Sequence, residues 1–238
     1  MKVTAILFDL DGTLLPMDQD DFTRYYFSNL AAKAATKGYQ PNALIDTVWA
    51  GTAAMVKNDG EKTNEAVFWE LFAAKYGGDA LNDIPFFEEF YRTDFQKAKE
   101  LCGFAPMAKD IVHSLKARGL RVILATNPLF PAIATESRIR WAGLEPDDFE
   151  LYTTYEDIGT CKPSPAYYRE VLSRLGLDPA DCLMVGNDVA EDMMAAAEAG
   201  IRGFLLTDCL INTPNADVNA YPHGSFDELN AYVNSLLA

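Results

Sequence analysis

Hydrophobic residues recur with two different spacings along the chain. Residues 3–8, Val-Thr-Ala-Ile-Leu-Phe, form a short apolar run rich in residues that favour strands, which predicts a buried β-strand. From residue 21 onwards the apolar residues instead return every three or four positions, as on one face of a helix. This part of the chain predicts no strand and four helices, at residues 21–37, 43–57, 63–76 and 86–101. Four successive helices can bury their apolar faces as a small bundle.

Beyond residue 104 short apolar runs alternate with helical stretches. The runs predict strands, at residues 121–125, 149–153, 182–185 and 203–206. The other stretches predict helices, at residues 108–118, 130–141, 165–175, 189–199 and from 225 onwards. Ser164 before Pro165 marks one helix start, and Ser225 with Glu228 has the spacing of a capping box. The alternation predicts the α/β class, with a doubly wound parallel sheet.

The alternation of strands and helices and the purely helical stretch together predict two domains. Residues 1–16 and 104–238 would form an α/β core, and residues 17–103 would form an all-helical cap inserted after the first strand. Sites in doubly wound sheets form at the carboxyl ends of the strands. Because the insert leaves the core from that edge, we expect it to cover the site as a lid.

Composition is that of an ordinary globular protein. The chain has 238 residues, of which 49% are hydrophobic and 23% are charged. No apolar stretch approaches the roughly 20 residues that span a bilayer, so we expect no membrane segment. The net charge of −15 argues against nonspecific binding to nucleic acid or to anionic membranes, which requires a basic surface. An anionic substrate stays open, because a bound metal can make a site locally positive.

Two further features bear on the compartment. The first strand leads directly into a functional-looking turn that a cleaved signal peptide would remove, so we expect no signal peptide and a cytoplasmic protein. The four cysteines are widely spaced and form no Cys-x-x-Cys pair or Cys/His cluster. This spacing argues against a disulfide framework and against a zinc site.

The most informative residues are the two acids that end the first strand, in the sequence Asp9-Leu10-Asp11-Gly12-Thr13-Leu14. Two carboxylates at one strand end repel each other. Such a pair usually persists because a cation or a reaction requires it. An acidic turn after a strand is the ordinary alternative, and the rest of the chain decides between the two.

Polar residues also follow three later strands of the predicted sheet. Thr126 and Asn127 follow the second strand, and Lys162 lies in the loop after the third. Asp188 follows the fourth strand, and Asp192 lies one helical turn further on, so both can face the same site. Each residue alone could be a helix cap or a solvated lysine. Their joint position after successive strands indicates a single site.

In this order the residues resemble the four signature motifs of the haloacid dehalogenase superfamily. The first is Asp9 to Leu14, the second Thr126, the third Lys162 in the context Lys-Pro-x-Pro, and the fourth the Gly-Asn-Asp-x-x-x-Asp pattern from Gly186 to Asp192. The helical insert is similar to the C1-type cap of this superfamily. The likeness covers the whole chain and points to the phosphoglycolate phosphatase and β-phosphoglucomutase-like group, most of whose relatives are Mg²⁺-dependent phosphatases.

The resemblance implies a role for each residue. Asp9 would be the nucleophile that forms an aspartyl-phosphate, and Asp11 the general acid and base. Mg²⁺ would be held by the Asp9 carboxylate, the Asp11 main-chain carbonyl and Asp188, since hard oxygen ligands suit this ion.

The other three motif residues would surround the phosphate. Thr126, with Asn127 beside it, would bind phosphate oxygens, and Lys162 would offset the charge of the phosphoryl group and of Asp9. Asp192 would orient Lys162 or a metal-bound water. Thr126 replaces the commoner serine of the family, and Asn187 stands where many members carry another acid.

The predicted function is Mg²⁺-dependent hydrolysis of a small phosphorylated metabolite, and several alternatives stay open. A sugar-phosphate mutase retains both acids, whereas haloalkanoate dehalogenases of the superfamily lack the second acid, here Asp11. A phosphonatase that depends on a cap lysine, a phosphorylated receiver module and a non-catalytic scaffold fit less of the pattern. Neither the ester nor the oligomeric state can be read from the sequence. Specificity is expected from the cap, where Arg24 is a candidate contact.

Overall fold

A central parallel sheet forms the expected α/β core. The computed structural model describes residues 3–237, so Met1, Lys2 and Ala238, which the expected boundaries include, lie outside the described residues. Within that range six strands form one sheet: β1 (Ala5–Phe8), β2 (Arg121–Leu124), β3 (Leu151–Tyr152), β4 (Cys182–Gly186), β5 (Arg202–Leu206) and β6 (His223–Gly224). Their order is β3-β2-β1-β4-β5-β6, and every neighbouring pair is parallel. The predicted fold class is confirmed.

Helices cover both faces of this sheet. The helices of the core are α5 (Pro106–Ala117), α6 (Ala132–Trp141), α7 (Pro165–Leu175), α8 (Ala195–Glu198) and α9 (Phe226–Leu237). Alternate residues of β1 enter two different apolar clusters, because strand side chains point to opposite faces. Ile6 and Phe8 pack with residues of α5 and α9, whereas Ala5 and Leu7 pack with residues of α7 and α8. Burial on both faces explains why the residues of β1 form a continuous apolar run.

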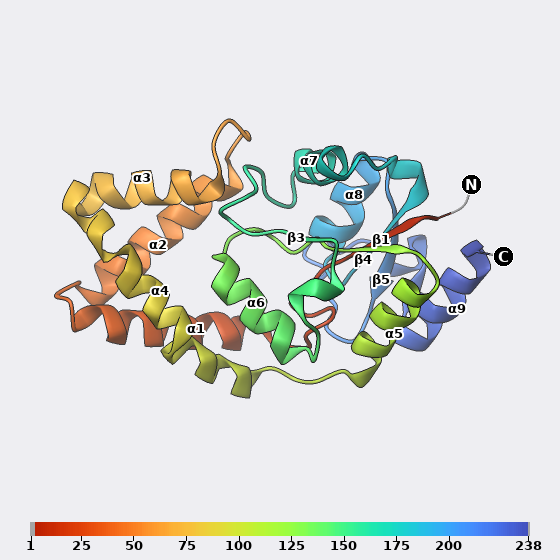
Figure 1. Ribbon diagram of the computed structural model, residues 1–238, viewed down its shortest axis with the longest axis horizontal. Coiled ribbons are helices and arrows are strands. Elements are labelled where there is room, and N and C mark those ends of the chain that lie inside the picture. The colour runs from red at the N-terminus through yellow and green to blue at the C-terminus, as the bar shows by residue number, and fades with distance from the viewer. Residues whose placement is uncertain (1–2, 238) are drawn as a thin grey trace.

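The helices of the insert gather on one side of the sheet, at the left of Figure 1. They are α1 (Gln19–Ala35), α2 (Pro41–Val56), α3 (Asn64–Tyr76) and α4 (Ile84–Arg92). Aromatic rings dominate the packing of these helices, as where Phe72 meets Phe87 with ring centroids 5.5 Å apart. Phe95 continues this packing to the core, because its ring lies 5.2 Å from that of Trp141 in α6.

The chain enters and leaves the helical insert at neighbouring points. Met17 and Cys102 form an antiparallel bridge. The Gly103 amide donates to the Pro16 carbonyl at 2.7 Å. Both connections therefore lie side by side at the edge of the sheet where β1 ends.

The structure differs from the predicted elements in four places. The helix predicted at 86–101 ends at Arg92, and a 3₁₀ segment, Asp94–Leu101, follows it. The Gln96 side chain donates to the Tyr91 carbonyl at 2.7 Å and to the Ser137 hydroxyl at 2.8 Å, which satisfies the helix end and ties it to α6.

The other three differences concern short elements. The strand predicted at 149–153 pairs only over Leu151–Tyr152, at the edge of the sheet. The helix predicted at 189–199 opens with a π-helical turn, Val189–Met194, before α8. Strand β6 was not predicted, because two residues without an apolar run carry no strand signal. Among the described residues, no helix has both the length and the apolar character of a bilayer span.

Candidate active site

The turn after β1 is fastened to the end of β4. The Asp9 amide donates to the Val185 carbonyl at 2.9 Å, which continues the pairing of the two strands. Gly12 has φ +84°, a conformation that side chains disfavour, and a Cβ there would lie 2.4 Å from the Asn187 side-chain nitrogen. Only glycine therefore fits this turn, which presents Asp9 and Asp11 at the carboxyl edge of the sheet.

Lys162 joins Asp9 to Asp192 in a buried cluster of three charges. Its Nζ donates to Asp9 Oδ1 at 2.9 Å and to Asp192 Oδ1 at 2.6 Å, and its side chain is 0% exposed. Burial alone would lower the pKa of Lys162, but Asp192 and Asp9 together raise it well above its usual value. Burial raises the pKa of Asp192 to about 7, against the attraction of Lys162. The ammonium group thus stays charged between the two carboxyl groups.

Successive hydrogen bonds hold the residues of the fourth motif in place. Asp192 Oδ2 accepts from the Asp188 amide at 3.0 Å. Asp188 Oδ1 in turn accepts from the Ala190 and Glu191 amides at 2.7 and 2.9 Å, so Asp188 caps the helical turn that follows. The capping bonds use only Oδ1, and Asp188 also lines the cavity described below.

Asn187 has a structural reason to be an amide. Its Oδ1 accepts from the Thr13 hydroxyl at 2.9 Å, and its Nδ2 donates to the Cys209 carbonyl at 2.7 Å. A carboxylate could not donate the second of these bonds. Asn187 therefore ties the first motif to the loop after β5.

The second motif lies beside a glutamate that the motif pattern did not indicate. Asn127 Nδ2 donates to both carboxylate oxygens of Glu191, at 3.2 and 3.1 Å, and to the Lys162 carbonyl at 3.3 Å. Burial raises the pKa of Glu191 to about 7. The Thr126 carbonyl accepts hydrogen bonds from the Thr153 and Tyr167 hydroxyls, and Thr126 also lines the cavity described below.

Arg138 is the other charged residue of the site that sequence reasoning missed. It lies in α6, is 1% exposed, and forms an ion pair with Asp11 Oδ2. The guanidinium stacks 4.4 Å from the centre of the Phe130 ring. Burial raises the pKa of Asp11 and the charge of Arg138 opposes this rise. A sequence signal existed, because Arg138 shares the helix face of the buried residues Ala134 and Trp141.

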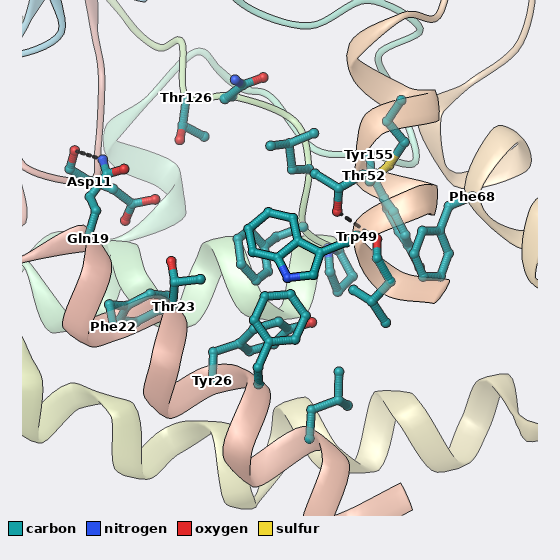
Figure 2. Close-up of a pocket in the computed structure, with 18 of the residues that line it drawn as sticks. Asp11, Gln19, Phe22, Thr23, Tyr26, Trp49, Thr52, Phe68, Thr126 and Tyr155 are labelled. Carbon is teal, nitrogen blue, oxygen red and sulfur yellow. Dashed lines mark hydrogen bonds between the residues drawn. The ribbon is translucent and has the colours of Figure 1, made fainter. Parts of the chain in front are cut away.

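One cavity of about 270 Å³ unites most of the predicted residues. Six of the seven line it: Asp9, Asp11, Thr126, Asn127, Asp188 and Asp192. The seventh, Lys162, is enclosed behind Asp9 and Asp192. Figure 2 shows Asp11, Gln19 and Thr126 at one end of the cavity and Trp49, Phe68 and Tyr155 at the other. Trp49 and Phe68 come from the helical insert, and Tyr155 comes from the loop after β3.

Arg24 lies away from this cavity. Its side chain is 75% exposed and pairs with Asp21 at 2.9 Å. It lines a separate surface hollow on the outside of α1 and α2. The structure therefore gives no contact of Arg24 with the site.

The expected metal ligands offer oxygen atoms that suit a hard cation. Asp9, Asp11 and Asp188 all line the cavity, and the Asp11 carbonyl accepts from Gln19 Nε2 at 3.3 Å. Among residues 3–237, no group of three or more His, Cys, Asp or Glu side chains is arranged to hold a metal. Two carboxylates and one carbonyl match the sparse protein ligation typical of Mg²⁺, which keeps several waters. The residues present therefore fit this ion.

Residues 3–200 match the family described as haloacid dehalogenase-like hydrolase, and the chain belongs to this family. This confirms the family that the four motifs resemble. A phosphoglycolate phosphatase of Colwellia psychrerythraea is 28% identical, over 98% of this chain and 96% of that protein. A bifunctional riboflavin kinase/FMN phosphatase of Arabidopsis thaliana is 27% identical over 98% of this chain, which spans only 54% of that longer protein.

Solved structures agree on the fold. A 2-haloacid dehalogenase of Pseudomonas syringae covers 99% of this chain and 100% of its own, with a TM-score of 0.66 and 20% identity. At that identity the likeness carries the fold alone. The assignment of a function therefore rests on the residues of the site and on the phosphatases among the relatives.

Proposed function

We propose that this hydrolase is a Mg²⁺-dependent phosphoric monoester hydrolase that acts on a small phosphorylated metabolite. One observation carries the proposal: Asp9 lines the cavity while the buried Lys162 holds its Oδ1 at 2.9 Å, with a second acid two residues away. A fixed carboxylate beside a buried cation is suited to attack phosphorus, because the cation offsets charge on both partners. The phosphatases of Colwellia and Arabidopsis support the same reaction class.

The reaction follows from the two acids. Asp9 attacks the phosphorus, so that a carboxylate oxygen–phosphorus bond forms and the bond to the leaving oxygen breaks. Asp11 gives its proton to that oxygen, which departs as the alcohol. Asp11 then accepts a proton from a water that attacks the aspartyl-phosphate, and inorganic phosphate leaves with Asp9 restored. The Thr126 hydroxyl and Lys162 stabilise the charge on the transferred group.

Mg²⁺ would be held by the Asp9 carboxylate, the Asp11 carbonyl and the Asp188 carboxylate. When bound, it offsets the negative charge of the phosphoryl oxygens so that an anionic nucleophile can approach. Asp192 and Asn187 support these ligands through the Asp188 amide and the Thr13 hydroxyl.

We also propose that residues 17–103 act as a cap domain over a core of residues 1–16 and 104–238. The paired connections at Met17 and Cys102 support this division, because both crossings of the chain meet at one point. Most aromatic residues of the cavity lining come from the insert, and all of its acidic residues come from the core.

Two alternatives are weaker. Dehalogenation of haloacids needs no second acid, and Asp11 is present and paired with a buried arginine. A sugar-phosphate mutase would convert its ester without releasing phosphate, so product analysis separates it from a phosphatase.

The test is a phosphate-release assay with Mg²⁺ present and after chelation with EDTA. Activity should vanish with EDTA, return with Mg²⁺ and be abolished by Asp9→Asn, since an amide is a poor nucleophile. The matched control is Asp110→Asn, at an exposed position of α5, which should keep full activity. Full activity of the Asp9→Asn protein, or of wild type after complete chelation, would refute the proposal.

A further inference from the structure

The cavity changes character sharply from one end to the other. Its charged lining residues are all acids at the sheet end: Asp9, Asp11, Asp188, Glu191 and Asp192. Eleven of its lining residues are aromatic, and nearly all of these come from the helical insert. Trp49, Phe68 and Tyr155 are examples in Figure 2. A leaving group bound beyond the phosphate would therefore contact rings and not charges.

No Lys, Arg or His of residues 3–237 lines the cavity. The two buried cations that contact lining acids are already engaged, because Lys162 pairs with Asp9 and Asp192 and Arg138 pairs with Asp11. A carboxylate or second phosphate on the leaving group would thus be buried without a counter-ion, at a large cost in free energy.

Several polar atoms of the aromatic end already have hydrogen-bond partners within the protein. The hydroxyls of Tyr26 and Tyr91 lie 2.9 Å apart, and Trp69 Nε1 donates to the Tyr155 hydroxyl at 3.3 Å. The Thr52 hydroxyl donates to the Val48 carbonyl at 2.9 Å. A sugar brings several hydroxyl groups that need partners when buried. The lining leaves few partners for them.

The size of the cavity sets a further limit. A cavity of about 150 Å³ lined by Leu, Ile and Phe holds one benzene ring. A cavity of about 270 Å³ therefore has room for a phosphoryl group and a compact apolar group.

We infer that the substrate is a phosphate monoester whose leaving group is uncharged and apolar, with an aromatic ring or a compact hydrocarbon of similar size. The inference rests on the proposed phosphatase activity and names its substrate class. It separates this chain from phosphatases for phosphoglycolate or phosphoserine, whose substrates carry a second charge on the leaving group.

The first test compares esters of simple alcohols in the presence of Mg²⁺. The probes are 2-phenylethyl phosphate, 2-phosphoglycolate, O-phosphoserine and glucose 6-phosphate, all with alkyl oxygens as leaving atoms. We expect kcat/KM for 2-phenylethyl phosphate to exceed that for each of the others by about 10²-fold, since apolar contacts and unpaired polar groups discriminate to this degree. A preference for any charged ester or for the sugar ester would overturn the inference while leaving the phosphatase proposal intact.

The second test measures binding without turnover. Benzylphosphonate and phosphonoacetate differ mainly in a ring against a carboxylate, and calorimetric titration in Mg²⁺ gives both dissociation constants. Tighter binding of benzylphosphonate supports the apolar preference of the cavity even if no ester is hydrolysed, in which case the proposed phosphatase activity fails and the ligand class stands. Equal or tighter binding of phosphonoacetate overturns the inference.

The third test installs a cation in the cavity. Thr52→Arg should raise the kcat/KM ratio of phosphoglycolate to 2-phenylethyl phosphate by about tenfold, because the new guanidinium can pair with the carboxylate. Ala50→Arg adds the same charge at an exposed position of α2 outside the cavity and should leave the ratio unchanged. Equal ratios in the two variants would show that this part of the cavity does not contact the leaving group.

Discussion

At the scale of single residues, the three buried charges of Lys162, Asp9 and Asp192 stabilise each other only as a set. Lys162→Met leaves two carboxyl groups buried without their cation. We expect a loss of about 3–5 kcal/mol in the free energy of unfolding, typical of a broken buried pair, together with loss of turnover. Urea denaturation measures the first effect and phosphate release the second.

Two comparisons sharpen this prediction. Lys97→Met removes a lysine that is 61% exposed and pairs with Asp94, so it should change stability by no more than about 1 kcal/mol. The double variant Lys162→Met with Asp192→Asn should lose less free energy of unfolding than the two single variants lose together. The reason is that a neutral amide replaces one of the carboxylates that Lys162→Met leaves without a cation. Strict additivity would show that the two charges are not coupled.

The pairing of Arg138 with Asp11 gives a second prediction. If the guanidinium positions the acid for proton transfer, Arg138→Gln should lower kcat by about 10²-fold, the usual cost of a displaced catalytic group. The Mg²⁺ concentration for half-maximal activity should stay the same, because the proposed ligand at Asp11 is its main-chain carbonyl.

Arg140→Gln is the matched control on the same helix. Its side chain is 49% exposed and pairs with Glu136, so kcat should not change. A shifted Mg²⁺ requirement with an unchanged kcat in Arg138→Gln would assign Arg138 to the metal site instead of to Asp11.

The sequence predicted which residues meet but not how they pair. Asp9, Thr126, Lys162 and Asp188 follow successive strands, and parallel strands bring their ends to one edge. The ion pair of Arg138 with Asp11 spans 127 positions of sequence. No local pattern encodes such a contact, since it depends on the placement of α6 against the turn. Glu191 was missed for the same reason, because its partner Asn127 lies on another strand end.

At the scale of elements, Asp83 joins the end of α1 to the start of α4. Its carboxylate accepts from Lys37 at 3.0 Å and from the Tyr39 hydroxyl at 2.8 Å. These hydrogen bonds, first that of Lys37, lower the pKa of Asp83 below its usual value. A lowered folded-state pKa means that the stabilisation is complete above the unfolded-state pKa of about 4 and is lost as the pH falls through the folded value.

Asp83→Asn should therefore reduce the free energy of unfolding at pH 7 by up to about 1 kcal/mol, in the range of partly exposed pairs. The difference from wild type should shrink below about pH 4. Urea titrations at several pH values measure it, with Asp79→Asn at a nearby exposed position as the control. A difference that grew on acidification would contradict this assignment.

Element boundaries were predicted well where the signal is local. Ser164 and Pro165 start α7 as expected, and the Ser164 hydroxyl caps the Ala166 amide. The break after Arg92 was missed, because it depends on Gln96 reaching Ser137 in α6 and on Phe95 packing against Trp141. The helical spacing of apolar residues continues through this break. The sequence pattern therefore predicts one helix where tertiary contacts divide the chain into two segments.

At the scale of the whole molecule, the insert is docked on the core at the start of α3. The Asn64 side chain is fully buried and donates to the Pro128 carbonyl and to Cys161 Sγ, both at 3.2 Å. The Asn64 amide also donates to the Ile158 carbonyl at 2.9 Å. These bonds bring the insert against the loop that follows β3 and against the second motif.

Gly159 shows how close this approach is. A Cβ at Gly159 would lie 2.5 Å from the Lys62 carbonyl of the insert. Gly159→Ala must therefore push the insert away from the core, whereas Asn64→Ala only removes the hydrogen bonds of the side chain. Both changes should favour a more open arrangement, which widens the cavity and admits water.

We expect Gly159→Ala to reduce kcat/KM for the preferred ester by up to about 10²-fold, because the aromatic end no longer holds the leaving group against the acids. Acetyl phosphate, which has little to contact there, should lose much less. The radius of gyration from small-angle scattering should rise. Gly78→Ala is the control, since a Cβ at Gly78 meets no atom within 4 Å. If Gly159→Ala lowered the rates for both substrates equally and left the radius of gyration unchanged, the insert would be a static cover and would not select the leaving group.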